Sequence, residues 1–429
     1  MLGQLLAAVA LAAGPTGSLT PAAGTSGCIV PKQAPAAISC TRVRELRWDA
    51  ALVSPDGRNL YTLGGIDTRS AITVMQRDRR TGAVRQLPGR QGCLVADWGG
   101  HVTFPSCLPA HLNIPVALAM TPDGRELVYV NHAGSYPLNA YNRSPRTGAL
   151  SRVDCCGAVR GLACGATSVA TSPDGRNVYT TNHTCTGYGL SVLVRDPSTG
   201  KLTQPKGEAG CIQRIGTGGC ARAPVTSFGP SEVAVTPDGA EVYVIAGGLF
   251  VFARNRATGT LKSRACYLAS ARPPCDAVSK LSPDLHGFGH FTIAPDGRNV
   301  YLISDARILV LARRPSGELS QLPSPKGCVT AAGDAGRCTA APGLDYGSLT
   351  ISPDGRTLYA TTESGLVVLS RNPVDGSLSQ LAGRYGRVRL RTFNAEPSAL
   401  SPDGRFLYTP AAFGAYGSSF GLRVLRRTG

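Results

Sequence analysis

A Pro-Asp-Gly turn recurs seven times along the chain and constrains its fold more strongly than any other feature of the sequence. The first copy reads SPDGRNLYT and starts at Ser54, and the other copies start at Thr121, Ser172, Thr236, Ala294, Ser352 and Ser401. Proline presets φ, aspartate bonds to its own backbone and glycine accepts a positive φ, so each copy predicts a tight turn. Because apolar or alternating runs flank every copy, each predicts two strands joined by that turn.

A second turn follows each copy and completes the repeating unit. For example, the run LVVLSRN from Leu366 leads into the turn PVDG and then into SLSQ, which ends at Gln380. Each unit therefore predicts four short strands, and the copies are spaced by 49 to 67 residues. That pattern is typical of a propeller blade. The predicted fold is an all-β, seven-bladed β-propeller with four antiparallel strands per blade.

The start of the chain is expected to close the ring. The sequence reaches Gly429 inside the seventh copy of the second turn, whereas PTGSLT, which starts at Pro15, matches the missing turn and strand. The N-terminal segment should therefore supply the outer strand of the last blade and cover an otherwise open sheet edge. Residues 1–13 are apolar and end in small residues, as in a signal peptide, although no Lys or Arg precedes the apolar run. We expect a signal peptide over residues 1–13 and one propeller domain over residues 14–429.

The fourteen cysteines fall mostly between the last strand of one unit and the first strand of the next. Their spacing predicts five disulfides: Cys28–Cys40, Cys93–Cys107, Cys211–Cys220, Cys266–Cys275 and Cys328–Cys338. Four more cysteines cluster near the third unit, where two bridges of unassigned pairing are expected: Cys155, Cys156, Cys164 and Cys185. A structural zinc site would show paired CxxC spacing, which the sequence lacks. Disulfides predict an oxidising compartment, so the protein is expected to be secreted or to lie in the periplasm or cell envelope.

The chain is strongly basic, with a formal net charge of +17 from 44 Lys and Arg and 27 Asp and Glu. Such an excess alone would favour an acidic partner such as nucleic acid or an anionic surface. The arginines, however, recur at two fixed places in the repeat, which predicts solvated rims around a ring and argues against nucleic acid as a partner. One set ends strands (Arg77, Arg143, Arg195, Arg254, Arg313, Arg371 and Arg426), and the other follows Pro-Asp-Gly (Arg58, Arg125, Arg176, Arg298, Arg356 and Arg405). After the N-terminal segment no apolar run reaches the roughly 18 residues of a membrane span, and a monomer is expected.

The seven Pro-Asp-Gly units, each with a hairpin such as RDPSTGKL from Arg195, resemble the lactonase family of seven-bladed propellers. That family includes 6-phosphogluconolactonase-like and carboxymuconate-lactonising enzymes and grades into secreted proteins with YVTN-type repeats. The resemblance covers residues 15–429. It implies the propeller fold and, as an activity, the hydrolysis or formation of a small lactone. The matching motifs are structural turns, so the resemblance assigns no catalytic residue.

The residues that break the repeat fall on the rim away from the Pro-Asp-Gly turns, at the mouth of the central channel. Two of them, Glu232 and His290, lie at the start of the strand that precedes Pro-Asp-Gly. The other four follow the strand after Pro-Asp-Gly: His132, His183, Asp305 and Glu363. A lactonase needs a base or metal to activate water and a donor or cation to hold the oxyanion. His290 or His183 could be the base, with Glu232 orienting it. The alternative is that these six are polar rim residues bonded to linker backbone.

A calcium site is a further expectation at the same rim. Six acidic residues are expected there: Asp49, Glu232, Asp305, Asp345, Glu363 and Glu396. Oxygen ligands from several blades suit a hard cation, although the sequence does not fix their mutual distances. Serine-hydrolase, zincin and nucleotide-hydrolysing functions are unsupported, because the sequence has no Gly-x-Ser-x-Gly, no His-Glu-x-x-His and no P-loop.

Two functions from different classes are therefore consistent with the sequence. The first is an extracytoplasmic lactonase-like enzyme that hydrolyses or forms a small cyclic ester at the channel mouth. The second is a non-catalytic propeller that binds an envelope or extracellular ligand through its rim. The family resemblance favours the first function, and the absence of a sharp catalytic motif favours the second. Whether the chain is an enzyme stays open at this point.

Overall fold

The computed structural model describes residues 14–47, 49–65, 70–98, 101–102, 105–134, 136–153, 159–162, 165–182, 188–216, 218–225, 229, 231–268, 273–277, 289–304, 306–392, 396–413 and 419–429. The signal peptide predicted over residues 1–13 lies outside the described residues. So does the cysteine cluster of Cys155, Cys156, Cys164 and Cys185. The bridges expected among those cysteines stay a prediction.

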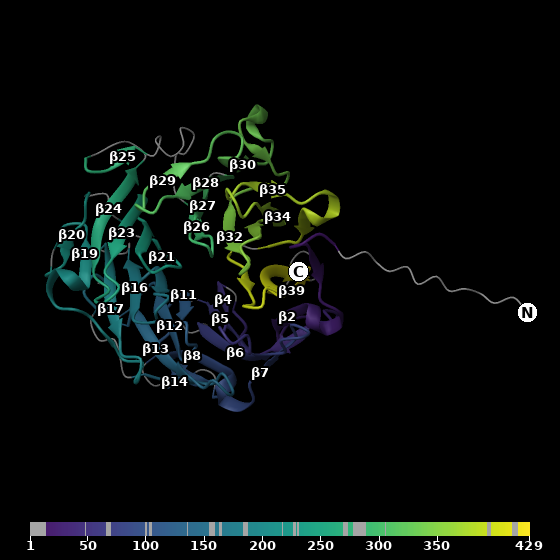
Figure 1. Cartoon of the computed structure of the whole chain (residues 1–429). Helices are drawn as coiled ribbons and strands as arrows, with labels where there is room; N and C mark the ends of the chain where they lie inside the picture. Colours follow the sequence, from purple (N-terminus) through teal and green to yellow (C-terminus); the bar gives the residue numbers. More distant parts are fainter. Residues whose placement is uncertain are drawn as a thin grey trace, which may run out of the picture.

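Seven separate sheets stand around a common axis, so the predicted seven-bladed β-propeller is confirmed (Figure 1). We number the blades by their Pro-Asp-Gly turns. The innermost strands are β4 (Ala50–Val53), β11 (Pro115–Met120), β15 (Ser168–Thr171), β21 (Glu232–Val235), β26 (His290–Ile293), β32 (Gly347–Ile351) and β37 (Ala399–Leu400). The second strands are β5 (Asn59–Gly64), β12 (Glu126–Asn131), β16 (Asn177–Asn182), β22 (Glu241–Ile245), β27 (Asn299–Ser304), β33 (Thr357–Thr362) and β38 (Phe406–Phe413).

The third and fourth strands complete each antiparallel blade. The third strands are β6 (Ala71–Arg77), β13 (Leu138–Arg143), β17 (Gly189–Arg195), β23 (Gly248–Arg254), β28 (Arg307–Arg313), β34 (Gly365–Arg371) and β39 (Ser419–Arg427). The fourth strand is single in β14 (Leu150–Arg152) and β24 (Leu261–Leu268). In the other blades it has two pieces that both pair with the third strand: β7 (Val84–Gln86) and β8 (Cys93–Trp98), β18 (Leu202–Thr203) and β19 (Cys211–Gln213), β29 (Leu319–Gln321) and β30 (Cys328–Thr330), β35 (Leu378–Gln380) and β36 (Arg387–Arg389), and β1 (Leu19–Pro21) and β2 (Cys28–Pro31).

Short 3-10 helices and a fifth strand decorate the outer edge. The 3-10 helices are η1 (Gly24–Gly27), η3 (Gly89–Gly92), η4 (Gly207–Gly210), η6 (Asp334–Gly336) and η7 (Gly383–Tyr385). Five blades add a short parallel strand that the sequence did not predict: β3 (Thr41–Val43), β10 (Leu108–Ala110), β20 (Ala221–Arg222), β25 (Asp276–Ala277) and β31 (Thr339–Ala340). In the first blade β9 (His101–Val102) also pairs with β8.

The five predicted disulfides are confirmed, and each anchors one of these parallel strands. Cys93 begins β8 and is bonded to Cys107, which directly precedes β10, and three other pairs repeat this arrangement. In the fourth blade Cys266 lies within β24, and its partner Cys275 directly precedes β25. All cysteines in the described part of the chain are in disulfides. Because each bridge closes a loop of about ten residues, the chain-entropy model gives roughly 2–3 kcal/mol of stabilisation per bridge. The linker that follows each fourth strand is thereby fixed as a strand.

The N-terminal segment closes the ring as predicted. Leu19 pairs with Arg427, and Ile29 pairs with Leu422, so β1 and β2 together form the outer strand of the seventh blade. The hydroxyl of Tyr359 in the sixth blade also donates a hydrogen bond of 2.9 Å to the carbonyl of Gly17. The first described residues therefore join the last blade to its neighbour as well as completing its sheet.

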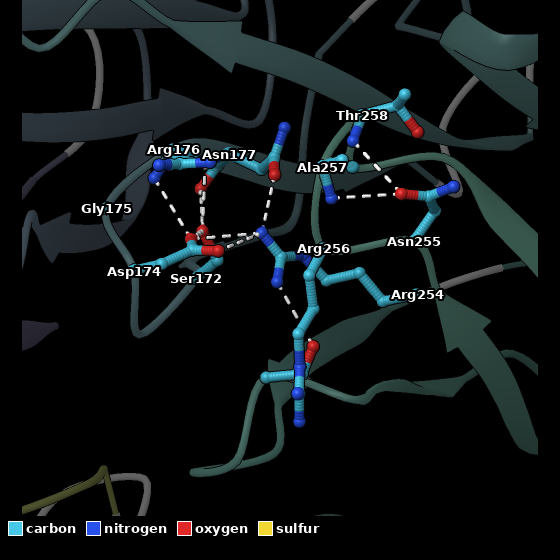
Figure 2. A network of polar contacts seen from close by, with 12 residues as sticks. Ser172, Asp174, Gly175, Arg176, Asn177, Arg254, Asn255, Arg256, Ala257 and Thr258 are labelled. Carbon is cyan, nitrogen blue, oxygen red and sulfur yellow. Dashed lines mark hydrogen bonds and ion pairs between the residues drawn. The ribbon is translucent and has the colours of Figure 1, made fainter.

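The strand-ending arginines are buried between blades, so their prediction as solvated rim charges is wrong. Arg254 donates to Tyr179, Asp174 and Asn177 of the preceding blade at 2.8, 2.9 and 2.6 Å, and Figure 2 shows its contacts with Asp174 and Asn177. Six of these arginines are at most 7% exposed and the side chain of Arg313 is 9% exposed. The seven arginines at these interfaces, which we call seams, are Arg77, Arg143, Arg195, Arg254, Arg313, Arg371 and Arg427.

Sequence reasoning placed Arg426 in this set, but Arg427 occupies the position and Arg426 is exposed. It also missed the burial of the set, because each partner carboxylate comes from a Pro-Asp-Gly turn one blade earlier. Although partial burial opposes ionisation, hydrogen bonds from Ser172 and Arg254 hold the pKa of Asp174 below its usual value. The aspartate of the turn thus has two functions, since it shapes the turn and also receives the next blade's arginine.

The tyrosines of the second strands pack inside the protein, as predicted, and six occupy one repeated place. All seven are fully buried. Tyr129 differs, because a register shift between Pro115 and Ala117 accompanies one extra residue in the second blade. Its hydroxyl donates to the carbonyl of His111 at 3.2 Å, and Arg195 lacks a tyrosine partner, so its Nε is buried without a hydrogen bond among the described residues.

Candidate functional site

The channel mouth is the rim where innermost strands begin, opposite the Pro-Asp-Gly turns. Glu232 begins β21 of the fourth blade, and His290 begins β26 of the fifth blade. These two strands are in contact around the ring. Each residue pairs with the end of its second strand, Glu232 with Ile245 and His290 with Ile303, so the backbone at both positions is held in regular sheet. The equivalent residue of the first blade is Ala50, which carries no polar group.

His290 and Glu232 meet at the mouth. His290 Nδ1 lies 3.6 Å from Glu232 Oε2, and the two side chains are 41% and 27% exposed. The neighbouring carboxylate raises the pKa of His290 above its usual value against the opposing effect of burial, and the more distant charge of Glu396 adds to the rise. Glu232 Oε2 is buried and has no hydrogen-bond donor among the described residues. A buried carboxylate oxygen without a donor is costly unless a ligand or water supplies one.

Two further acids, Glu396 of the seventh blade and Asp49 of the first blade, interact with each other, and Glu396 also interacts with His290. Burial and the nearby carboxylate of Asp49 together raise the pKa of Glu396 to about 7, against the opposing charge of His290. Asp49 is fixed by the N–H of Gly65, which donates to Oδ2 at 2.9 Å. Gly64 has φ +152°, and a Cβ there would lie 2.4 Å from the Asp49 carboxylate. Glycine at this place therefore makes room for the acid.

The remaining predicted site residues are placed differently. His132 follows β12 in the second blade, is half-buried and donates its backbone N–H to Ile114 at 2.8 Å. Glu363 is exposed in the turn between β33 and β34, and its carbonyl accepts the N–H of Thr392 at 3.2 Å. In the described part of the chain neither side chain is brought to the His290–Glu232 pair. His183 and Asp305 lie outside the described residues, so their prediction stays untested.

The calcium site stays a prediction. Within the ranges that the structure describes, no group of three or more His, Cys, Asp or Glu side chains is arranged to hold a metal ion. Of the six acids predicted as a set, Asp305 lies outside those ranges. Glu232 and Glu396 both face His290 instead, which gives a histidine flanked by two carboxylates rather than a cage of oxygens.

The hollows lined by described residues lie elsewhere. One of about 400 Å³ borders Arg58, Arg77 and Arg146, and another of about 830 Å³ borders Leu19, Tyr385 and Arg426. Both belong to the turn rim and its outer edge. The channel mouth is nevertheless the candidate site, because titratable groups with displaced pKa values converge there.

Glu396 is the residue whose part in this site sequence reasoning missed. It was grouped only with prospective calcium ligands, since its neighbours along the chain carry no catalytic motif. The signal available in the sequence was its position, because Glu396 and Asp49 occupy the same place before the innermost strands of two adjacent blades. Two acids at one repeated place in neighbouring blades predict like charges close together, and such pairs raise a carboxyl pKa.

The arrangement can exchange protons near neutral pH. An imidazole and a carboxyl group, both with raised pKa values, face one opening, and a second carboxylate orients the imidazole. Groups of this kind act as general base and general acid when a substrate lies between them. A cluster that perturbs pKa values inside a cleft is a candidate active site.

Comparison with known proteins supports the fold but does not assign an activity. No protein-family model matches the chain, and no curated protein matches it. Among solved structures, the periplasmic gluconolactonase PpgL from Pseudomonas aeruginosa is similar at 22% identity and a TM-score of 0.55, over 86% of this chain and 96% of that one. A protein from Bacteroides uniformis, provisionally assigned as a 6-phosphogluconolactonase, is similar at 17% identity and a TM-score of 0.54, over 80% and 85% of the two chains.

These likenesses confirm the predicted resemblance to lactonase-like propellers as a resemblance of fold. At such identities they do not transfer an activity. The five disulfides indicate an extracytoplasmic location, because reducing compartments do not maintain such bonds. Among the residues that the structure describes, no helix has the length and apolar character to cross a membrane.

Proposed function

We propose that the protein is a secreted or periplasmic lactonase that hydrolyses a small cyclic ester at the channel mouth. The observation that carries this proposal is the ion pair of His290 and Glu232, 3.6 Å apart, with a buried carboxylate oxygen that still needs a donor. Glu396 faces the same pair and has a pKa of about 7. Together they supply a base, a group that orients it and an acid.

In the proposed reaction Glu232 holds the Nδ1–H of His290, so that the other ring nitrogen is free to accept a proton from water. The resulting hydroxide adds to the lactone carbonyl carbon and forms a tetrahedral intermediate. Its collapse breaks the ring C–O bond, and Glu396, in its protonated form, donates a proton to the departing alkoxide oxygen. The imidazolium then returns its proton to the Glu396 carboxylate through solvent. The net change is lactone plus water to hydroxy acid, and each proton is accounted for.

The charge of the mouth favours a substrate without a phosphate group. Glu232 and Glu396 both interact with His290, and Asp49 interacts with Glu396, so three acids and one histidine are coupled at the described part of the opening. A phosphorylated sugar lactone would be repelled, whereas a neutral aldonolactone would not. The open hydroxy acid is an anion, and the same charges would speed its release. We therefore propose an uncharged sugar lactone as the substrate class.

The test is hydrolysis of a lactone panel that pairs gluconolactone with 6-phosphogluconolactone, measured above the spontaneous rate with and without chelator. We expect hydrolysis of the neutral lactone, and His290→Ala should lower kcat/KM at least ~100-fold with an unchanged Tm. Glu232→Gln should act in the same direction. Glu363→Gln is the matched control, because it removes an exposed carboxylate from the same rim and should leave the rate unchanged.

The second candidate function is an extracytoplasmic binding module. It is favoured by the 3.6 Å separation of His290 and Glu232, which exceeds hydrogen-bond length, and by the described hollows lying away from the pair. No hydrolysis across the panel, or hydrolysis unchanged in both His290→Ala and Glu232→Gln, would refute the lactonase proposal and leave this one. If the wild-type protein hydrolyses a lactone only when no chelator is present, the reaction requires a metal ion.

A further inference from the structure

The seam between the seventh and first blades differs chemically from the other six. At the second residue after Pro-Asp-Gly, six blades have a polar side chain, namely Asn59, Glu126, Asn177, Glu241, Asn299 and Thr357, but the seventh has Phe406. Arg77, which fills this seam, stacks on Phe406 with 5.3 Å from the guanidinium to the ring centre. Its Nη2 is buried without a hydrogen bond in the described part of the chain, and it lies 3.7 Å from Asp403. The corresponding distance from Arg254 to Asp174 is 2.9 Å.

Two hollows lie over this seam on the turn rim. One of about 450 Å³ is lined by Arg79, Arg80, Asp403 and Arg405. The other, of about 420 Å³, shares Arg80, Asp403 and Arg405 and adds Arg426 together with Phe406 and Gly429. Volumes of this size are within the range of small-ligand sites. Because three side chains border both hollows, the two form one continuous site.

The charge in this site is concentrated and poorly compensated. Four exposed arginines, Arg79, Arg80, Arg405 and Arg426, border the two hollows, and Asp403 is the acidic side chain that lines both. A second acid, Asp78, lies next to them in sequence and interacts with the charge of Arg80, so the four positive charges outnumber two negative ones. Partial burial opposes ionisation of Asp403, but hydrogen bonds from Ser401 and the Arg405 backbone, with the charges of Arg77 and Arg405, keep its pKa below the usual value. It therefore remains a single negative charge at neutral pH.

Among the described residues, the hollow over the neighbouring seam has three exposed arginines, Arg58, Arg85 and Arg146, whereas the seventh seam has four. The second turn of the first blade reads Asp78-Arg79-Arg80, whereas the corresponding turns of the second and fourth blades carry one arginine at these two positions, Arg146 and Arg256. Arg256 is moreover engaged by the carbonyl of Asp238, to which it donates at 2.6 Å. Arg405 at the seventh seam belongs to the repeat, whereas the adjacent pair Arg79 and Arg80 is specific to the second turn of the first blade.

We propose that the site bordered by Arg79, Arg80, Arg405 and Arg426 binds a multiply charged oxyanion of the phosphate type. Guanidinium groups present paired N–H donors that match phosphate oxygens, and several on one wall favour a ligand with more than one charged group. Asp403 orders the site by holding the Arg405 backbone at 3.1 Å. The site is on the opposite rim from His290, so it is independent of the proposed hydrolysis.

The test is calorimetric titration of the full chain with inorganic tripolyphosphate, and separately with inorganic phosphate. It is carried out at about 150 mM salt, where diffuse attraction is screened beyond about 8 Å. We expect one tripolyphosphate per chain and weaker binding of phosphate. Arg80→Gln combined with Arg405→Gln should weaken tripolyphosphate binding at least tenfold. The matched control, Arg176→Gln with Arg298→Gln, removes the same charge from two other seams and should change the affinity less than twofold.

Three outcomes would overturn the proposal. These are an equal loss of affinity in the two double variants, several equivalent tripolyphosphate sites per chain, or no binding at millimolar ligand. All four arginines of these variants are exposed, so the fold should survive, and an unchanged Tm in each variant checks it. Glu232→Gln should leave tripolyphosphate binding unaltered, so that failure of this site and failure of the lactonase proposal are distinguished.

Discussion

The two rims of the propeller use charge in opposite ways. On the turn rim each seam arginine is buried against the aspartate of the preceding blade, and the pattern repeats around the ring. At the channel mouth the charged groups of two blade pairs, His290 with Glu232 and Glu396 with Asp49, are partly exposed and occur once each. Repetition marks the interactions that hold the ring together, whereas departures from the repeat mark groups that are free to act on a ligand.

The largest effect should come from removing one seam arginine. Arg254→Met leaves Asp174, Asn177 and Tyr179 without their shared donor, and breaking a buried pair from one side costs about 3–5 kcal/mol. Chemical denaturation should show this loss in the free energy of unfolding. The control is Arg176→Gln, which removes an exposed arginine from the turn that contains Asp174. It should change the free energy of unfolding by less than about 0.5 kcal/mol. Comparable effects of the two would contradict the contrast between buried and solvated arginines.

At the channel mouth, protonation of Glu396 should make the free energy of unfolding depend on pH. The pKa of Glu396 is raised from 4.5 to about 7 on folding, so its protonated form is favoured by the folded state. That stabilisation is fully present below pH 4.5 and is lost as the pH rises toward 7. Relative to Glu396→Gln, the wild-type free energy of unfolding should fall by roughly 1–2 kcal/mol between pH 5 and 8, after allowance for solvent screening. If the free energy of unfolding varied with pH in the same way in the wild type and in Glu396→Gln, the raised pKa of Glu396 would be contradicted.

A smaller effect is expected where the N-terminal segment joins the sixth blade. Tyr359→Phe removes a hydroxyl that donates to the Gly17 carbonyl and accepts from Arg427 at 3.0 Å. The variant should lose about 1–1.5 kcal/mol of unfolding free energy. Tyr129→Phe is the matched control. The Tyr129 hydroxyl interacts with the His111 carbonyl at 3.2 Å and with Tyr141, but Arg195 Nε makes no hydrogen bond to it among the described residues, so this variant should lose less. The reverse order would mean that the ring is not closed at this point.

The local parts of the fold could be predicted from the sequence, and the parts set by neighbouring blades could not. The turns, the five disulfides and the pairing of Leu19 with the last strand follow from residues close in sequence or from the repeat itself. The burial of Arg254 depends on Asp174, which is 80 residues away, and no local pattern shows that contact. The altered place of Tyr129 depends on a register shift in the strand beside it.

The candidate site was predictable only as a set of rim residues. Glu232 and His290 could be identified because each replaces a small or apolar residue at a repeated position. That they meet depends on the packing of β21 against β26, and the raised pKa of Glu396 depends on burial and on Asp49. Neither burial nor the distance between blades is encoded by spacing along the chain.

The way the ring is closed has a consequence for biosynthesis. Ser18 and Thr428 are hydrogen-bonded although they are 410 positions apart, so the segment around Ser18 finds its partner only after the units between them have been made. Until that partner is available, β1 and β2 have no sheet to join, and the cost of bringing such distant segments together slows this step. Six blades can form in order as the chain emerges, but the seventh can form only after β39 has been made. An incomplete chain would accordingly leave an exposed sheet edge, the kind of surface on which chaperones act and aggregates begin.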